Sequence, residues 1–291
     1  MDNESVKRLI SDAYNLYRTY EDYKHTADFT RTVIKCNEER ERLFQDPKFQ
    51  DKTRLEPYGY RVYSQNDEDG VIAEIFNRIG TTSKFFIEFG VEKGVENNTL
   101  YLLLQDWSGV WLDGNSAYVD AIYQKFAHYI RNRKLTAVHA MITRGNIDML
   151  FEQTGCTKQE VDLLSIDIDG NDYHVLEAIT VIKPRVIVIE YNAKFPPPMR
   201  WVMQYNPNHM WDGSDMQGMS LTALEELAAA KGYQLAGTNI TGTNAFLVRK
   251  DLAGNLFTLP ASAENLYNPP RYYLQFYRGH ELINAPLNGF L

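Results

Sequence analysis

The sequence predicts an α/β protein with a doubly wound, mostly parallel sheet of seven strands and an N-terminal helical appendage. Two observations support this prediction. Between residues 71 and 232, short apolar runs alternate with segments of helical periodicity, which is typical of a parallel sheet covered by helices. Two apolar runs, 233–237 and 244–249, then follow each other without a helix between them, and this order predicts an antiparallel pair that closes the sheet.

The expected parallel strands are apolar runs that end at acidic or turn residues. The first run leads into a glycine turn, and Pro184 leads into the last, which consists of Val and Ile before Glu190. These strands cover residues 85–89, 109–113, 135–142, 161–168 and 186–190.

The expected helices have apolar residues three and four positions apart. Ser64 and Asn146 can cap helices that follow them, and Gly80 and Gly232 end helices. The segment 193–219 has no such pattern, and a loop of that length is usually functional. The helices cover residues 71–79, 100–103, 118–131, 147–151, 175–179 and 221–231.

The composition narrows the class of protein. The chain has 291 residues, 44% hydrophobic and 23% charged, which suits one large α/β domain with appendages or two small domains. A net charge of −8 argues against a nucleic-acid partner, which needs a basic face. Two cysteines build no disulfide framework or cysteine-based zinc site, the N-terminus is polar, and no apolar run reaches about eighteen residues. We therefore expect a cytoplasmic protein without a membrane span.

Two arms flank the predicted sheet domain, which covers residues 62–250. The first arm, residues 1–61, contains an amphipathic helix at 4–23, a weaker helix at about 28–45 and a connector. These helices either pack on the core, form a lid, or join two copies of the chain as a homodimer. The second arm, residues 251–291, is rich in aromatic side chains and is expected to be packed, because disordered segments are poor in them.

The stretch from Phe85 to Gly94 is the most informative motif. An apolar run carries Glu88 near its end, and Gly90 and Gly94 let the backbone turn tightly and pass close to a ligand. The spacing differs from the G-x-G-x-x-G dinucleotide pattern, and Glu92 in the turn would repel an anion. S-adenosylmethionine (SAM), with a positive centre and free ribose hydroxyls, suits this turn. An ordinary glycine turn is the alternative.

A second acidic residue follows at the distance expected for a ribose contact. Asp113 ends the apolar run at 109–113, about twenty residues after the glycine turn. An acidic residue at the tip of the second strand of an open α/β sheet commonly accepts hydrogen bonds from ribose hydroxyls. Alternatively, Asp113 only starts a turn with Gly114.

Three of the expected parallel strands end in further acidic side chains: Glu88, the pair Asp167 and Asp169, and Glu190. The tips of parallel strands meet along one edge of the sheet, and carboxylates crowded there need a counter-charge. A Mg²⁺ ion held by Asp169 and Glu190 would supply it, and so would the sulfonium of SAM or an amine of the substrate.

Candidates for removing a proton come from the same region. Asp167 and Asp169 are catalytic candidates, unless Asp169 only belongs to a turn. His174 lies on the next expected helix, and a histidine titrates near neutral pH and can act as a general base. His209 in the long loop has the same chemistry, although either histidine can instead be a structural hydrogen-bonder. Three aromatic residues of that loop either line an acceptor pocket, stack on a sugar or only pack within the loop: Trp201, Tyr205 and Trp211.

Taken together, these segments resemble the FkbM-type branch of the class I SAM-dependent methyltransferases, which have a Rossmann-like sheet of this strand order. One departure is at the fourth strand tip, where many members carry a single acidic residue followed by Glu-Gly and this chain has Asp-Ile-Asp-Gly-Asn-Asp. The matching segments, spread over about 62–250, are SQNDEDG at 64–70, FIEFG at 86–90 with Gly94, NNT at 97–99, GVWLDGN at 109–115, LSIDIDGNDY at 164–173, VIEYN at 188–192 and GTNAFLV at 242–248.

The resemblance implies SAM as methyl donor and O-methylation of a hydroxyl, often on sugars or secondary metabolites. It places Asp167 at the methyl-transfer centre. By motif, the SAM contacts fall on Glu88, Gly90 and Gly94 for the methionine part, on Asp113 for the ribose, and on Ile142 and Thr143 for the adenine.

The sequence therefore predicts a SAM-dependent O-methyltransferase that modifies a hydroxyl of a sugar or a sugar-containing acceptor. Two alternatives remain. One is a metal-dependent glycosyltransferase in which Asp167-Ile168-Asp169 holds a metal ion and a nucleotide diphosphate; the other is a non-catalytic interaction module. The glycine turn favours SAM over the first, and the acidic strand tips argue against the second. The sequence does not set the acceptor, the oligomeric state or the metal requirement.

Overall fold

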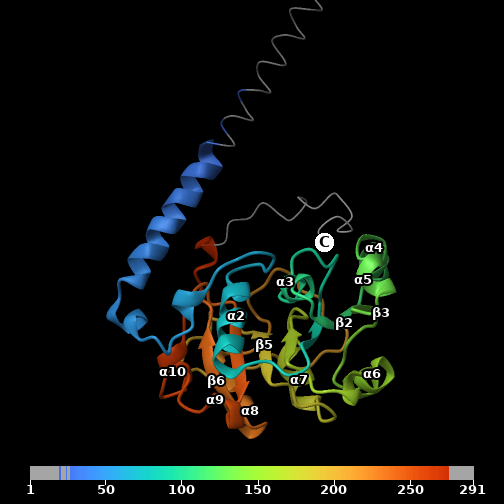
Figure 1. The fold of residues 1–291 in the computed structure, drawn as a ribbon. Helices are drawn as coiled ribbons and strands as arrows, with labels where there is room; N and C mark the ends of the chain where they lie inside the picture. Colours follow the sequence, from blue (N-terminus) through green and yellow to red (C-terminus); the bar gives the residue numbers. More distant parts are fainter. Residues whose placement is uncertain (1–19, 21–23, 25–26, 275–291) are drawn as a thin grey trace, which may run out of the picture. The chain divides into compact units, whose positions relative to one another are not determined.

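The computed structural model describes residues 20, 24 and 27–274 of a chain that divides into two compact units, residues 1–50 and 51–291 (Figure 1). Apart from Tyr20, the helix expected at 4–23 lies outside the described residues. Among the helices that the structure describes, none has the length and apolar character needed to cross a bilayer. The cytoplasmic location stays a prediction.

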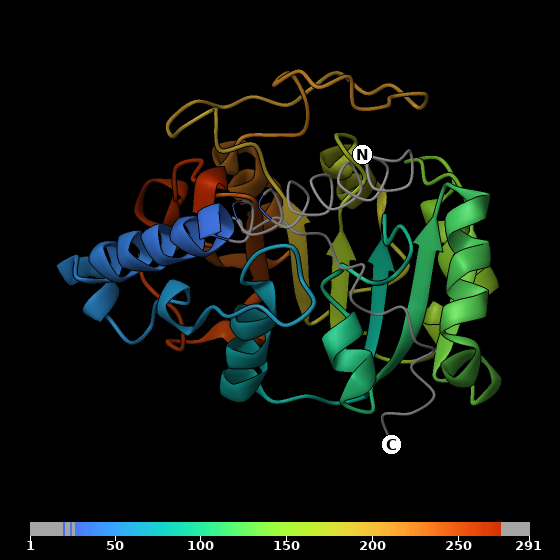
Figure 2. The same cartoon turned by 90° about the horizontal axis from the view of Figure 1, so that it is seen from above.

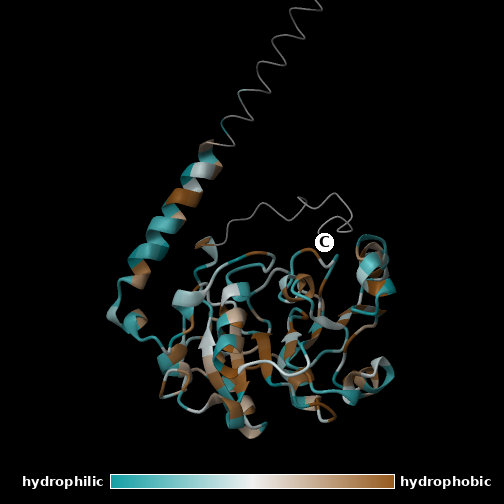
Figure 3. Ribbon diagram, viewed as in Figure 1, coloured by the Kyte–Doolittle hydropathy of each residue, from teal (hydrophilic) through white to brown (hydrophobic). Residues whose placement is uncertain are grey.

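The described part of the first unit is helical. Residues 27–44 form one helix, which confirms the helix predicted at about 28–45, and η1 (Pro47–Gln50) follows it. The rings of Phe44 and Phe49 meet edge to face with centroids 5.3 Å apart. Glu39 pairs with Arg42 on the same helix at 2.7 Å. The helix surface is mostly hydrophilic (Figure 3).

The second unit is built on a seven-stranded sheet. Its strands are β1 (Phe85–Phe89), β2 (Ser108–Asp113), β3 (Leu135–His139), β4 (Leu163–Ile166), β5 (Val186–Glu190), β6 (Tyr233–Thr238) and β7 (Asn244–Arg249). Their order is β3-β2-β1-β4-β5-β7-β6. The first five strands are parallel, and β7 runs antiparallel to both β5 and β6. This confirms the doubly wound sheet with an antiparallel closing pair.

Helices connect the parallel strands, as predicted, and further helices precede and follow the sheet. They are α2 (Glu68–Ile79), α3 (Leu100–Leu104), α4 (Ser116–Lys125), α5 (Ala127–Arg131), α6 (Ile147–Thr154), α7 (Asp172–Ala178), α8 (Leu221–Ala230), α9 (Lys250–Ala253) and α10 (Ala263–Leu266), with 3-10 helices η2 (Glu56–Tyr58), η3 (Cys156–Lys158) and η4 (Tyr272–Leu274). The long segment between β5 and α8 runs outside the sheet (Figure 2).

Several predicted boundaries were wrong, and three of them matter for the site. The single helix expected at 118–131 is two helices, because the backbone of Phe126 leaves the helical region where its ring packs edge to face on Trp111. Strands β3 and β4 end at His139 and Ile166, earlier than expected. The residues that follow them, including Asp167, are therefore on loops at the edge of the sheet and not within the strands.

Helices cover both faces of the sheet, so its strands are buried on both sides. Phe85, Ile87 and Phe89 pack with residues of α6, α7 and α8, whereas Phe86 packs with residues of α2, α3 and α4. The strands of this unit are accordingly among its most hydrophobic parts (Figure 3). Glu88 points to the same face as Phe86 because side chains alternate along a strand.

The segments flanking residues 62–250 fold with the sheet. Leu55 is fully buried, and Arg54 and Glu56 form a buried ion pair with an N–O distance of 2.9 Å. From the other end of the chain, Asn268 donates a hydrogen bond to Glu56 at 3.1 Å. Residues 51–61 and the described part of the C-terminal segment are thus parts of the second unit, because buried charges tie them together.

Candidate functional site

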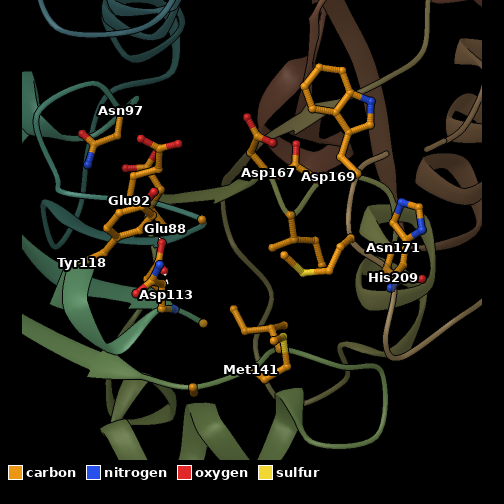
Figure 4. A pocket seen from close by; sticks show the side chains of 18 of the residues that line it. Glu88, Glu92, Asn97, Asp113, Tyr118, Met141, Asp167, Asp169, Asn171 and His209 are labelled. Carbon is orange, nitrogen blue, oxygen red and sulfur yellow. Dashed lines mark hydrogen bonds between the residues drawn. The ribbon is translucent and has the colours of Figure 1, made fainter. Parts of the chain in front are cut away.

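A cavity of about 730 Å³ opens at the carboxyl ends of β1, β2 and β4. This is the point where the strand order reverses, which is where open α/β sheets bind ligands. Its size lies in the range of small-molecule sites. Two groups of side chains face each other across it (Figure 4). The turn side consists of Glu88, Glu92, Asn97, Asp113 and Tyr118, and the loop side of Asp167, Asp169, Asn171 and His209.

The glycine turn after β1 brings the two sides together. Gly90 has φ +68°, and a Cβ there would lie 1.8 Å from the carbonyl oxygen of Asp167. Its N–H donates to the carbonyl of Leu112 at 3.0 Å. Glu92 has φ +48°, a conformation that residues with a side chain rarely adopt and that clusters at functional sites. Gly90 therefore permits a close backbone approach, but the group that approaches is the tip of β4, whereas the sequence predicted an approach to a ligand.

Glu88 is a buried carboxylate that organises the segment before α3. It accepts hydrogen bonds from the N–H groups of Asn98 and Thr99, at 2.8 and 3.1 Å, and from the Thr99 hydroxyl at 2.5 Å. Burial raises the pKa of Glu88 to about 7, although these hydrogen bonds oppose the shift. Beside it, the Nδ2 of Asn97 is buried and has no hydrogen-bond partner in the described part of the chain. A hydrogen-bond donor is thus available at this wall.

Asp113 holds the glycine turn from the tip of β2. Its carboxylate accepts hydrogen bonds from the N–H of Glu92 at 2.8 Å and from the N–H of Asn115 at 2.7 Å. The second bond is the local turn that the sequence offered as an alternative, and the first joins β2 to the turn after β1. Burial raises the pKa of Asp113. Both roles expected for it are therefore compatible with its position on the cavity wall.

Three carboxylates meet on the loop side. Asp167 and Asp169 follow β4, Glu190 ends the adjacent β5, and oxygens of the three lie within 4.8 Å of one another. The structure records no hydrogen-bond donor or ion-pair partner for them among the described residues. Burial, followed by repulsion between neighbouring carboxylates, holds the pKa values of Asp167 and Glu190 well above their usual range. This cluster therefore favours a cation or bound protons.

The Asp-Gly-Asn-Asp segment forms a turn, and its members have different roles. Asp172 accepts hydrogen bonds from two backbone N–H groups of the turn, each at 2.9 Å. Asn171 donates to the carbonyl of Asn206 at 2.8 Å and so ties the turn to the long loop. Asp169 has φ +56° and lines the cavity. A turn and a site thus coexist here, because Asp172 holds the turn and leaves Asp169 for a ligand.

The predicted site residues fall into two sets. Gly94 and Thr143 do not line the cavity. A Cβ at Gly94 would lie 2.6 Å from the ring of Trp111, so this glycine lets the turn pack on the core. The Thr143 N–H donates to Asn146 Oδ1 at 2.8 Å, before α6. The predicted residues that do line the cavity are Glu88, Gly90, Asp113, Ile142, Asp167 and Asp169, with Glu190 beside them.

His174 was predicted to be catalytic, but the structure places its side chain away from the cavity. Its Nε2 is hydrogen-bonded to the carbonyl of Met203 at 2.8 Å, its ring packs against Tyr205, and it does not line the cavity. His209 does line the cavity, and its buried Nε2 has no hydrogen-bond partner among the described residues. A lone histidine at helical spacing cannot reveal which way its ring points, and packing decided it here.

Several lining residues carry no sequence motif. Met141 lies two residues past the end of β3 and is 57% exposed, and Met210 and Trp211 of the long loop are 75% and 58% exposed. The length and aromatic content of the loop were the signals for Trp211. No sequence signal marked Met141 as a cavity residue, because it lay within the strand predicted at 135–142. These side chains add an exposed apolar part to an otherwise polar cavity.

Part of the chain matches a known protein family. Residues 123–235 match the family model described as Methyltransferase FkbM domain. The match includes the loop-side residues of the cavity, whereas the glycine turn and Asp113 precede it. No curated protein matches the chain.

The chain is also similar to solved structures. A TehB-like SAM-dependent methyltransferase from Corynebacterium glutamicum is 14% identical with a TM-score of 0.37, over 62% of this chain and 87% of that one. The N-terminal domain of EvdMO1 with SAH bound is 14% identical with a TM-score of 0.40, over 72% and 94%. An O-methyltransferase family protein from Burkholderia thailandensis is 10% identical with a TM-score of 0.37, over 63% and 58%.

The sheet and the family match agree. The strand order, with its antiparallel closing strand, is the doubly wound arrangement that the sequence predicted. The matched residues contain the tips of β4 and β5. The match of residues 123–235 to a methyltransferase FkbM domain therefore supports a SAM-dependent methyltransferase.

Proposed function

We propose that this methyltransferase transfers the methyl group of SAM to a hydroxyl of a sugar or a sugar-containing acceptor. The observation that supports the proposal is the division of the cavity. The turn-side carboxylates Glu88 and Asp113 are held by hydrogen bonds, whereas the loop-side pair Asp167 and Asp169 is left for a ligand. A donor site and an acceptor site with a proton-accepting group account for this division.

The turn side is the proposed SAM site. Asn97 Nδ2 would donate to the carboxylate of the methionine part, next to Gly90, which lets the backbone come close. Asp113 has lone pairs left for ribose hydroxyls after accepting two backbone N–H groups. Ile142 would contact the adenine. Gly94 and Thr143 would act only through the backbone that they shape.

The loop side is the proposed acceptor and proton-transfer site. SAM is already reactive, so the protein needs to align the acceptor hydroxyl with the methyl group and to remove its proton. Asp167 is the proposed base, because burial and the neighbouring carboxylates raise its pKa and make its ionised form a stronger proton acceptor. Asp169 and His209 would orient the hydroxyl from the same side (Figure 4).

A divalent metal ion is the second candidate for this step. The three oxygens of Asp167, Asp169 and Glu190 lie within 4.8 Å of one another, and such hard oxygen ligands suit Mg²⁺. A bound ion would lower the pKa of the acceptor hydroxyl. The same carboxylates would then serve as ligands, and a protein side chain such as His209 would take the proton.

A chelator separates the two versions. With Mg²⁺ at the site, EDTA abolishes methyl transfer, Mg²⁺ or Mn²⁺ restores it, and Glu190→Gln loses turnover while it still binds SAM. With Asp167 as an unaided base, activity persists in EDTA and the pH–rate profile reports the base. Full activity of metal-stripped protein would rule out the metal version.

A ligand screen tests the methyl-donor assignment against the glycosyltransferase alternative. Ligands that bind the folded state raise the melting temperature by mass action. We expect SAM and S-adenosylhomocysteine to raise it and nucleotide sugars to leave it unchanged. A shift with nucleotide sugars alone would contradict the assignment.

We also propose a homodimer through the N-terminal helices, on the strength of the apolar face that the sequence places at Leu9, Ile10 and Leu16. Deleting residues 1–45 should then change the molar mass in solution measured by light scattering. A truncated chain with the assembly state of the parent would oppose this proposal.

A further inference from the structure

The charges around the cavity are one-sided. Among the described residues, those that line it include six carboxylates and no lysine or arginine. Glu190 adds another at the edge of the loop side. A pocket of this composition repels anions and attracts cations, and the low dielectric of a cavity strengthens both effects. The electrostatics therefore bear on which acceptors can enter.

Part of this charge is already balanced within the protein. Glu96 pairs with Arg61 at 3.3 Å, and Glu88 and Asp113 accept hydrogen bonds from the backbone. The remaining carboxylates are Glu92 on the turn side and the loop-side cluster. The unbalanced charge is thus concentrated where the acceptor is proposed to bind.

The charge of the methyl donor SAM does not neutralise the carboxyl groups on the loop side of the cavity. SAM carries an ammonium and a sulfonium against one carboxylate, which is a net charge of about +1 at neutral pH. In the proposed pose, its ammonium and carboxylate lie against the turn side, near Glu88 and Asn97. Only the sulfonium faces the loop side, where the three carboxyl groups of Asp167, Asp169 and Glu190 lie within 4.8 Å of one another.

The side-chain oxygen of Asn244 also lacks a hydrogen-bond donor among the described residues. Asn244 is 3% exposed, lines the cavity and lies opposite Glu190 in the β5–β7 ladder. Its Nδ2 donates to Glu68 at 2.8 Å, which fixes the amide orientation, and its Oδ1 has no hydrogen-bond partner among the described residues. A buried oxygen without a partner is costly, so a ligand that donates hydrogen bonds accounts for it. The loop side therefore offers several hydrogen-bond acceptors to a ligand that donates, with His209 Nε2 beside them.

We propose that the acceptor is a cation, an amine-bearing hydroxyl compound of the amino-sugar class whose protonated amine lies against Asp169, Glu190 and Asn244. The inference rests on the proposed function and narrows its acceptor. Phosphorylated and carboxylated sugars are disfavoured, because the described lining residues include no lysine or arginine to meet their charge, only His139 and His209. A divalent ion is the other source of positive charge for the same carboxylates, and the experiment separates the two.

Three pyranoses that differ mainly in charge test the proposal: glucosamine, glucose and glucuronic acid. Each is titrated by ligand-observed NMR into the full-length protein saturated with S-adenosylhomocysteine, at low salt and with EDTA. We expect glucosamine to bind at least about tenfold more tightly than glucuronic acid, with glucose between them, and high salt to shrink the difference. Absence of glucosamine binding, or glucuronic acid binding as tightly as glucosamine, overturns the proposal.

Two variants and one added ion sharpen the result. Asp169→Asn should reduce the preference for glucosamine, whereas Glu152→Gln, an exposed carboxylate on α6, should leave it unchanged. If Mg²⁺ makes glucuronic acid the tightest ligand, the ion is the counter-charge and the proposal fails. S-adenosylhomocysteine binding is followed in the same samples. Its loss would count against the methyltransferase site itself, whereas a wrong order of sugars with that binding intact counts only against the acceptor class.

Discussion

The two sides of the cavity use carboxylates in opposite ways. On the turn side, Glu88 and Asp113 accept four hydrogen bonds from backbone N–H groups between them, and these bonds build the wall. On the loop side, Asp167 and Asp169 accept none from the described residues. The turn side is therefore a preorganised structure that a donor completes. The loop side is held in an unfavourable state that a reacting group or a cation relieves.

The largest expected effect is a loss of turnover caused by a substitution on the loop side. Asp167→Asn removes the proposed base and should lower turnover by about 10²–10⁴-fold, while SAM affinity is retained. Because the change also removes one of several mutually repelling carboxylates, the melting temperature should rise. Calorimetry, steady-state kinetics and thermal melts measure the three quantities. A variant with parental turnover would remove Asp167 from the chemistry.

The next effect comes from a substitution at the backbone contact between the turn side and the loop side of the cavity. Gly90→Ala places a Cβ against the backbone of Asp167, whereas Gly80→Ala has the same φ of +68° and meets nothing within 4 Å. Both should lose roughly 1–2 kcal/mol of unfolding free energy through the left-handed conformation. Only Gly90→Ala should lose more than that, and SAM binding with it. Equal losses in denaturant melts would show that the turn can move away from β4.

A smaller effect distinguishes the two roles of Asp113, which are to hold the glycine turn and to contact SAM. Asp113→Ala should weaken SAM binding by roughly 1.5–3 kcal/mol, because it removes a charged acceptor and leaves two N–H groups without it. Asp113→Asn keeps one acceptor oxygen for the turn and should lose less. Isothermal calorimetry measures both variants. Unchanged affinity in a folded Asp113→Ala protein would place the ribose elsewhere.

The smallest expected effect is a pH dependence on the turn side. The folded pKa of Glu88, about 7, is above its usual value, so its contribution to stability is complete at low pH and is lost as pH rises through about 7. The positive charges of SAM favour the ionised form, so SAM affinity should increase over the same pH range. Glu88→Gln should flatten this increase in calorimetry at several pH values. The same increase in the variant would assign it to another group, such as Asp172, whose pKa is raised to about 6.

Several features of the site could be predicted because they depend on local chemistry. Gly90 was recognisable because only glycine combines a left-handed turn with a close backbone approach, and Asp167 because acidic residues at neighbouring strand ends must converge. His174 and Thr143 were misplaced because the direction of a side chain beyond a strand end depends on tertiary packing. The end of β3 was also set too late, which hid Met141.

The sequence by itself determined the fold class and the set of acidic residues that follow its strands, because hydrophobic periodicity and the succession of elements along the chain are properties of the sequence alone. Only the tertiary structure decided how those residues divide. It paired Glu88 and Asp113 with backbone N–H groups of distant segments, and it left Asp167 and Asp169 without such partners. The physical reason is that hydrogen bonding and desolvation act through space, so the role of each carboxylate depends on neighbours that the chain brings together only when it folds.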